Sequence, residues 1–452
     1  MSDITINERT AGQLKLLSQA LDSGRLGPVR RMINALNAGE IGHLLESLPP
    51  GQREIAWGLV DSEYDGEVLL HVNDEVRESL IAEMDQAELI DAASDLDVDD
   101  LADIIDDLPD TVLREVLTGM ERGDRERLEN VLSYPDESAG RLMSLNLVTV
   151  RSDVTIEVVL RYLRMRGDLP RIIDYLFVIS RTGEYQGRLA ISDVLSRDPD
   201  DAVVDIVDAS IPPYSVTTSA RQVAQDFQNN DWISAPVVDH RNVLVGRITV
   251  DDVVDLIREE ADRNVLSMAG LNEDEDMFAP VFSKARRRTL WLGVNLITAL
   301  MAASVIGHFA ETLEKLVALA ILMPLVASMG GIAGTQTLTL IIRGLAVGQV
   351  NDGNARALLS KELGVGCING CLFALVIGLT VAAWFQDLKL GGVIAAAILI
   401  NLSLAALGGV LIPLALKRMK IDPALAGGVV LTTVTDVMGF FVFLGLGTWL
   451  LI

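Results

Sequence analysis

Residues 431–452 read LTTVTDVMGFFVFLGLGTWLLI and contain one carboxylate, Asp436, in a segment that is otherwise apolar from Ala424 to the last residue. A segment of this length meets the requirement of roughly 20 apolar residues for crossing a lipid bilayer. An acid at the centre of a spanning helix costs roughly 2.5–3.5 kcal/mol, and such acids usually face a pathway for a substrate or ion. The stretch therefore predicts a membrane protein in which Asp436 is functional.

The rear part of the chain holds five apolar segments that are long enough to span a membrane, at about 289–309, 316–342, 357–385, 391–416 and 424–451. Basic residues alternate between their connectors. Three connectors carry clusters of cations: Arg286, Arg287, Arg288; Arg343, Arg356, Lys361; Lys417, Arg418, Lys420. The other two carry only Lys315 and Lys389. The positive-inside rule predicts a multi-pass protein of the cytoplasmic membrane with residues 1–283 in the cytoplasm and an external C-terminus.

The front part of the chain is strongly acidic. Residues 1–283 hold 25 Lys and Arg against 56 Asp and Glu, a net charge of −31, whereas residues 284–452 have a net charge of +5. Such a surface repels nucleic acid and attracts cations. Seven acids crowd between residues 95 and 107 without a Lys or Arg among them, which favours a bound counter-cation. The chain has no P-loop lysine and no Cys/His cluster at motif spacing, which argues against an enzyme.

Two kinds of soluble region follow each other. Residues 10–135 show helical spacing of apolar residues, for example in LLSQALDSG (16–24), and Pro-containing helix ends at 48–50 and 108–110 predict stacked helical hairpins. Residues 140–260 contain two similar units, each reading short strand, helix, strand, turn, strand, helix. This internal repeat predicts a tandem pair of small α/β modules.

Polar and small residues interrupt the second predicted span. Pro324, Gly330, Gly331 and Gly334 weaken a helix in lipid and are tolerated where the backbone is buried in protein or lines a wet cavity. The hydroxyls beside them have a simpler interpretation, because they can bond back to their own helix. An acid with hydroxyls and an open backbone suits Mg²⁺, which keeps its water and binds few carboxylates.

The motifs together resemble one family. GRLAISD (187–193) and GRITVDD (246–252) resemble tandem CBS modules, and VDDLADIIDDLP (98–109) and YPDESAGRLMS (134–144) resemble the region that precedes them. With MGGIAGTQTLTLIIRGLA (329–346) and DPALAGGVVLTTVTDVMG (422–439), the chain resembles the MgtE-type magnesium channel/transporter family.

The resemblance implies a multi-domain membrane protein with five parts. These are an acidic, all-α superhelical N domain (1–137), CBS domain 1 (138–203), CBS domain 2 (204–262), a connecting plug helix (263–288) and a five-helix transmembrane domain (289–452). It also implies a homodimer with a Mg²⁺ pathway between protomers, closed by high cytosolic Mg²⁺.

Site residues follow from the same resemblance. The ion pathway would include Asp436, Thr432, Gly331, Thr335 and Gln336. The regulatory Mg²⁺ ligands would be Glu67, Asp99, Asp103, Asp231, Asp252, Asp255 and Glu260. ATP would bind the CBS pair through Thr249 and Asp252.

The chain departs from the family pattern at several of these places. Ile332, Thr335 and Gly428 replace asparagines of the spans, and Arg221, Arg263 and Asn264 replace acids of the sensor. Two other interpretations therefore stay open besides a Mg²⁺-gated channel. One is a carrier coupled to H⁺ or Na⁺, and the other is a membrane Mg²⁺ sensor that conducts nothing.

Overall fold

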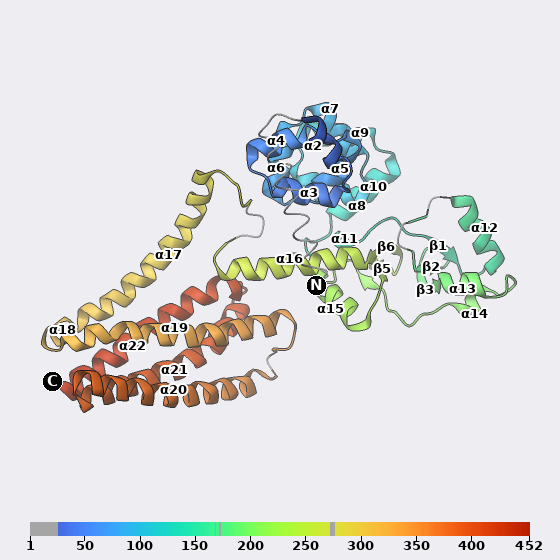
Figure 1. Ribbon diagram of the computed structural model, residues 1–452. Helices are drawn as coiled ribbons and strands as arrows, with labels where there is room; N and C mark the ends of the chain where they lie inside the picture. The colour runs from blue at the N-terminus through green and yellow to red at the C-terminus, as the bar shows by residue number, and fades with distance from the viewer. Residues whose placement is uncertain (1–25, 168, 171–172, 272–275, 352) are drawn as a thin grey trace. The chain divides into compact units, whose positions relative to one another are not determined.

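The computed structural model describes residues 26–452 except 168, 171–172, 272–275 and 352. The chain forms two compact units (Figure 1). The first contains the residues up to Glu260 and a short segment ending at Ala279, and the second contains the segment that starts at Ala261 and Pro280–Ile452. The described residues confirm the predicted fold class of a helical front, two small α/β modules and five long apolar helices. The predicted helical stretch LLSQALDSG lies outside the described residues.

Short helices build the front of the first unit. They are α2 (Leu26–Ile33), α3 (Ala38–Glu46), α4 (Pro50–Trp57), α5 (Asp65–Leu70), α6 (Asp74–Glu83), α7 (Gln86–Ser94), α8 (Val98–Ile104), α9 (Asp110–Gly119) and α10 (Arg122–Leu132), with single 3₁₀ turns at Ser62–Tyr64 and Ile105–Asp107. Side-chain oxygens of Asn37, Asn73 and Asp85 accept backbone N–H groups at the starts of α3, α6 and α7. Each such cap stabilises its helix by about 1 kcal/mol.

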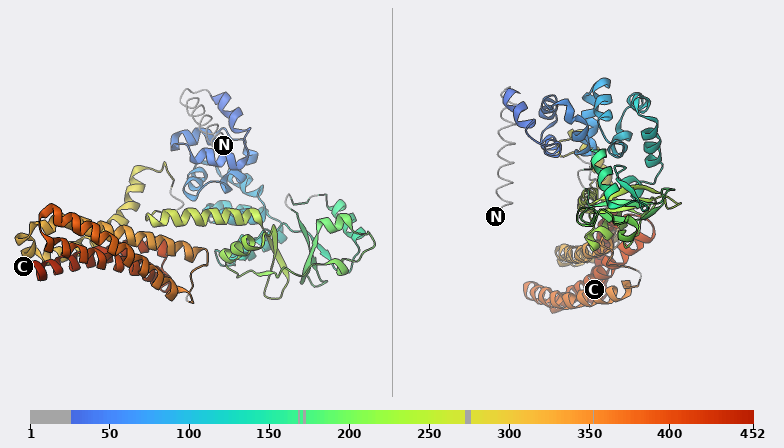
Figure 2. Two further views of the ribbon diagram at one scale, coloured as in Figure 1. Left: turned by 60° about the horizontal axis from the view of Figure 1, so that its bottom comes forward. Right: turned by 90° about the vertical axis from the view of Figure 1, so that its right-hand side faces the viewer.

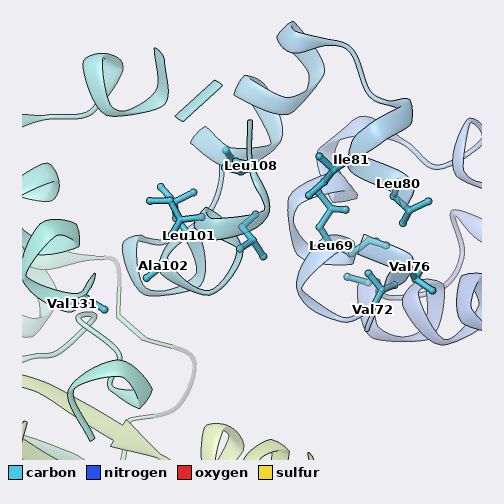
Figure 3. Packing of buried hydrophobic residues seen from close by; sticks show 14 of the residues in the cluster. Leu69, Val72, Val76, Leu80, Ile81, Leu101, Ala102, Leu108 and Val131 are labelled. Carbon is cyan, nitrogen blue, oxygen red and sulfur yellow. The ribbon is translucent and has the colours of Figure 1, made fainter. Parts of the chain in front are cut away.

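The helices bury a shared apolar core. Val76 and Leu80, one turn apart on α6, are fully buried and lie near Leu69 of α5 (Figure 3), and the same core includes Leu101 of α8. Burial of one such side chain contributes roughly 1.5–3 kcal/mol. The core therefore fixes α8, the helix that carries the acids of the 95–107 run.

The internal repeat appears as two similar modules. The first has α11 (Ala139–Leu142), β1 (Thr149–Arg151), α12 (Ile156–Arg166), β2 (Tyr175–Ile179), β3 (Tyr185–Ala190), α13 (Ile191–Ser196) and α14 (Val203–Ile206). The second has β4 (Tyr214–Ser215), α15 (Ala220–Asn230), β5 (Ser234–Val238), β6 (Leu244–Thr249) and α16 (Val250–Met268). In each sheet the first two strands are parallel and the last two antiparallel. Val178 pairs with Gly187 and Val237 with Gly246, so the repeat extends to the strand register.

The connection between the modules and the long helices differs from the prediction of a single helix over 263–288. α16 continues the second module without a break to Met268, and α17 (Val281–His308) begins only after Pro280. Gly270 lies between them with φ of +72°, a left-handed conformation that ends an α-helix. The predicted connecting helix is therefore shared between the end of α16 and the start of α17.

The segment before α17 is bound to the helical front by a buried ion pair. Arg53 of α4 donates from Nη1 to Asp276 Oδ2 at 2.9 Å, and their side chains are only 2% and 6% exposed. The same guanidinium donates to the carbonyls of Leu45 and Leu48. The Asp276 amide donates to Glu75 at 2.6 Å. These bonds fix Asp276 to the first unit.

The second unit is built from long helices. After α17 come α18 (Ala310–Lys315), α19 (Val317–Ala346), α20 (Ala355–Phe385), α21 (Leu388–Arg418) and α22 (Pro423–Leu451), and α19 to α22 run side by side (Figures 1 and 2). Five of these helices, all except α18, are long and apolar enough to cross a membrane. The last four match the predicted spans within a few residues, whereas α17 begins earlier than predicted, at Val281.

Candidate functional site

Asp436 lies halfway along α22 and is partly buried. Among the residues that the structure describes, its carboxylate takes part in no ion pair. The exposed Thr432 lies one turn before it. The Thr432 hydroxyl donates to Gly428 O and Val429 O, and the Thr432 carbonyl accepts the Thr435 hydroxyl at 3.0 Å. Asp436 is therefore the polar group of this stretch that is not bonded within its own helix.

The second predicted span is an unbroken helix. α19 continues through Pro324 and the three glycines, so the expected open backbone is absent from this described helix. The exposed Thr335 donates its hydroxyl to Gly331 O at 2.9 Å, and Gln336 is also exposed. The hydroxyls of Thr335 and Thr432 thus bond back to their own helices, as the simpler interpretation of the sequence holds. Gly330 and Gly334 instead permit close packing against Asn401 of α21 and Leu431 of α22.

Packing contacts place the pathway candidates at matching depths on α19 and α22. The two helices run antiparallel, because Gly447 packs on Leu319, Leu431 packs on Gly334, and Gly427 packs on Leu338. This order brings Asp436 level with Gly331, and Thr432 level with Thr335. All four residues lie on two neighbouring helices, and Thr335 and Thr432 face the outside of the single chain.

A second carboxylate of the long helices was not among the predicted site residues. Glu362 of α20 is only 7% exposed and accepts a hydrogen bond from Thr337 of α19 at 3.2 Å. Thr337 in turn packs against Gly409 of α21. The sequence held a signal for this residue, since Glu362 lies inside the predicted span 357–385. What it could not give is the burial and the hydroxyl partner.

Four carboxylates meet in the first unit and are called the acidic cluster here: Asp99, Asp100 and Asp103 of α8 and Asp252 of α16. Burial and the neighbouring acids raise the pKa of Asp100 to about 7. Burial, Asp251 and Asp99 raise the pKa of Asp252 to about 6, against the effect of its hydrogen bonds from Thr249. The pKa of Asp103 is raised to about 6 by desolvation and by Asp99 and Asp252, although Arg141 opposes the shift.

The structure thus brings together three predicted regulatory residues, Asp99, Asp103 and Asp252, and adds Asp100. Desolvation also raises the pKa of Asp99, and both Ser144 and Arg247 oppose that shift. Among the described residues, no group of three or more acidic, His or Cys side chains is arranged to hold a metal ion directly. Carboxylate oxygens are nevertheless the donor type that Mg²⁺ prefers, and Mg²⁺ commonly keeps several of its waters when it binds to proteins.

The other predicted regulatory residues are found in different surroundings. Glu260 forms an ion pair with Arg221 at 2.8 Å, so a residue that replaces a family acid neutralises another acid. Glu67 and Asp255 are exposed on α5 and α16. Asp231 is the left-handed C-cap of α15, with φ of 54°.

The two nucleotide candidates are bonded to each other. Thr249 donates its hydroxyl to Asp252 Oδ2 at 2.9 Å and its amide to the same oxygen at 3.3 Å. A hollow of about 360 Å³ lies nearby between α15 and α16, but its lining is mostly apolar and includes Asp231 rather than Thr249 or Asp252. The geometry therefore ties this hydroxyl to the acidic cluster.

Comparison with known families divides the chain in the same order as the structure. The family model of MgtE divalent cation transporters matches residues 323–446, that of the MgtE intracellular N domain matches 36–137, and that of the CBS domain matches 139–200 and 203–259.

Similar proteins include the magnesium transporter MgtE of Bacillus subtilis, which is 27% identical over 430 residues, covering 95% of both chains. The magnesium transporter MgtE of Thermus thermophilus is 27% identical over 441 residues, covering 96% of this chain and 98% of that protein. Among solved structures, the cytosolic domain of the Mg²⁺ channel MgtE in complex with ATP is 28% identical, with a TM-score of 0.48, covering 53% of this chain and 98% of that one.

Proposed function

Because the chain belongs to the MgtE family of magnesium transporters, we propose that it is a Mg²⁺ channel whose pathway passes Asp436 and closes when cytosolic Mg²⁺ binds the acidic cluster. The observation that carries this proposal is the lone carboxylate of Asp436 in an apolar helix, without an ion pair among the described residues. An intramembrane acid without a basic partner is stabilised by a passing cation.

The exposed polar residues of α19 and α22 support a homodimer. Thr335, Gln336 and Thr432 lie on the outer surface of the single chain. Exposure of such groups to lipid is unfavourable, since hydrocarbon offers no hydrogen bonds. A second copy facing this surface would enclose a wet pathway with an Asp436 carboxylate on each side. Two carboxylates suit a hydrated Mg²⁺, which binds through its own water.

The acidic cluster supports control by Mg²⁺. Desolvation by burial, and then repulsion from the neighbouring carboxylates, raise the pKa of Asp100 to about 7. A divalent cation offsets this repulsion more effectively than a proton on one acid. Since α8 belongs to the helical front and α16 to the second module, binding would hold these two parts together in the closed state.

We also propose that ATP binds at the second module through Thr249 and Asp252. A nucleotide would have to replace the 2.9 Å hydrogen bond between these residues. Thr249→Val removes the hydroxyl and should abolish any rise in Tm that ATP causes. An unchanged rise in Tm in this variant would exclude this residue from nucleotide binding.

The orientation follows from the basic connectors. The cation clusters at Arg286–Arg288 and Lys417–Lys420 support an orientation with residues 1–283 in the cytoplasm and the C-terminus outside. Labelling of single cysteines at the two ends of α22 in intact cells tests this orientation.

Mg²⁺ uptake by a Mg²⁺-auxotrophic strain tests the proposal as a whole. The wild-type chain should restore growth, whereas Asp436→Ala at equal membrane abundance should not. A wild-type flux that needs a proton or Na⁺ gradient would instead favour a coupled carrier. Mg²⁺ binding without any flux would favour a sensor that conducts nothing.

A further inference from the structure

Asn401 is the most deeply buried amide of the long helices. It lies in the middle of α21 and is 1% exposed. A polar side chain at this depth in a membrane protein is costly, since few partners replace water there. Its retention therefore calls for a role that an apolar residue of similar volume would not fill.

The side chain of Asn401 fills the space left by two glycines on two other helices. A Cβ added at Gly330 of α19 would clash with Asn401 Nδ2, and one added at Gly439 of α22 would lie 2.8 Å from the same atom. Neither glycine can carry a side chain while Asn401 is present. Three helices thus meet at one amide.

Hydrogen bonding fixes only half of this amide. Nδ2 donates to the Val326 carbonyl of α19 at 2.9 Å. Oδ1 has no hydrogen-bond donor among the described residues. The Cβ direction of each glycine points at the amide, so the backbones of Gly330 and Gly439 lie directly against it. The amide is thus hydrogen-bonded to α19 and packed closely against both α19 and α22.

This junction lies directly behind the proposed pathway. Gly330 is adjacent to Gly331, and Gly439 follows Asp436 by one helical turn. A change in the distance between α19 and α22 at Asn401 therefore moves the Asp436 carboxylate relative to α19. Conduction needs contacts that are favourable enough to admit an ion and weak enough to release it, so such a movement would alter flux and selectivity.

We propose that Asn401 is a positioning residue that sets the separation of α19 and α22 and, through it, the fit of the hydrated ion at Asp436. The proposal rests on the proposed function, because it assigns the ion pathway to this face of α22. It predicts an effect on ion selectivity, which a purely structural amide would not have.

The test uses the full-length protein in liposomes, with Mg²⁺ and Ca²⁺ fluxes measured separately over a range of concentrations. Asn401→Leu keeps the branched shape and the number of non-hydrogen atoms of the side chain but removes the donor to Val326. We expect the Mg²⁺ flux per folded protein to fall about tenfold and the Mg²⁺-to-Ca²⁺ flux ratio to change by a similar factor, as for other residues that position an ion ligand. Ser403→Ala is the matched control, because the Ser403 hydroxyl donates to Leu399 O of the same helix. It should leave both quantities unchanged.

Two results would overturn the proposal: an unchanged flux and ratio in Asn401→Leu, or a flux that falls only with the amount of folded protein while the ratio stays constant. If Asn401→Leu does not fold, two other variants are compared by the same two quantities: Asn401→Ala and the double variant Gly330→Ala/Asn401→Ala. In the double variant, the methyl group added at position 330 refills the space that Asn401→Ala vacates. Asp436→Asn is measured in parallel. Its loss of flux alongside an unaffected Asn401→Leu would refute the positioning role alone, whereas undiminished Mg²⁺ flux in Asp436→Asn would refute the proposed pathway.

Discussion

Carboxylates in the two units meet opposite environments. In the acidic cluster, Asp99, Asp100, Asp103 and Asp252 crowd each other, and the pKa of Asp100 is raised to about 7. In the long helices the acids are isolated: Glu362 accepts one hydroxyl hydrogen bond, and Asp436 forms no ion pair among the described residues. A crowded cluster gains from any bound cation, so it responds to concentration. An isolated acid offers one weak contact, so it lets an ion leave as readily as it enters.

The largest expected effect concerns Asp436, the isolated carboxylate of α22. Asp436→Asn keeps the size of the side chain and removes its charge, so Mg²⁺ flux into liposomes should be abolished. Asp436→Glu keeps the charge on a longer side chain and should retain part of the flux. Size-exclusion chromatography of both variants controls for folding and association. Wild-type flux in Asp436→Asn would make this carboxylate structural.

A paired acid in the first unit gives a reference for the unpaired ones. Arg53→Ala leaves Asp276 buried without its partner and should lower the free energy of unfolding by about 3–5 kcal/mol. Arg30→Ala is the matched control, because the Arg30–Asp61 pair is exposed, and its loss should cost less than about 1 kcal/mol. Urea unfolding of the first unit measures both losses of stability. Equal losses would show that burial does not distinguish these two pairs.

The pH dependence of stability tests the acidic cluster. Asp100, Asp103 and Asp252 bind protons more tightly when folded, at pKa values of about 7, about 6 and about 6, than when unfolded, at the ordinary 3.8. Without Mg²⁺, their contribution to stability is therefore fully present below about pH 4 and is lost as pH rises through 6 to 7. Mg²⁺ should raise the Tm little at pH 5 and clearly at pH 8.

The comparison of Tm at the two pH values has a contradicting outcome and a control variant. An equal Mg²⁺-dependent rise in Tm at both pH values would show that the raised pKa values do not belong to the Mg²⁺ site. The same comparison in a variant with Asp99, Asp103 and Asp252 replaced by Asn should show no Mg²⁺ dependence at either pH.

The smallest expected effect concerns one member of the cluster. Asp100→Asn removes one repelling charge and should raise the free energy of unfolding without Mg²⁺ by about 1–2 kcal/mol at pH 8. The exposed Asp106 is the control, and Asp106→Asn should change stability by less than about 0.5 kcal/mol. A destabilised Asp100→Asn would mean that its carboxylate is already compensated in the folded state.

Local patterns made much of the fold predictable. Runs of apolar residues gave the five long helices, and the spacing of GRLAISD and GRITVDD gave two modules whose registers coincide at Gly187 and Gly246. The break at Gly270 was missed because the helical pattern continues on both sides of it. The charge run gave Asp99 and Asp103 but could not show that Asp252 lies against them.

The missed site features all depend on contacts between distant residues. Arg221 neutralises Glu260 across 39 positions of sequence. The Thr337 hydroxyl reaches Glu362 from another helix. In the sequence, Asn401 is one polar residue among several in the predicted spans. Only its packing against Gly330 and Gly439 in the structure distinguishes it from the others.

The buried ion pair of Arg53 and Asp276 limits the length of free chain that precedes α17, the first long helix. Asp276 is fixed to α4, and α17 begins at Val281, directly after Pro280. Four residues, fully extended, reach at most about 14 Å, so the path from Asp276 to Pro280 cannot lengthen beyond that. If the helical front moves away from α17 by more than this reach, either the ion pair breaks or the first turn of α17 is pulled. The Arg53–Asp276 pair thus couples a movement of the helical front to a membrane helix.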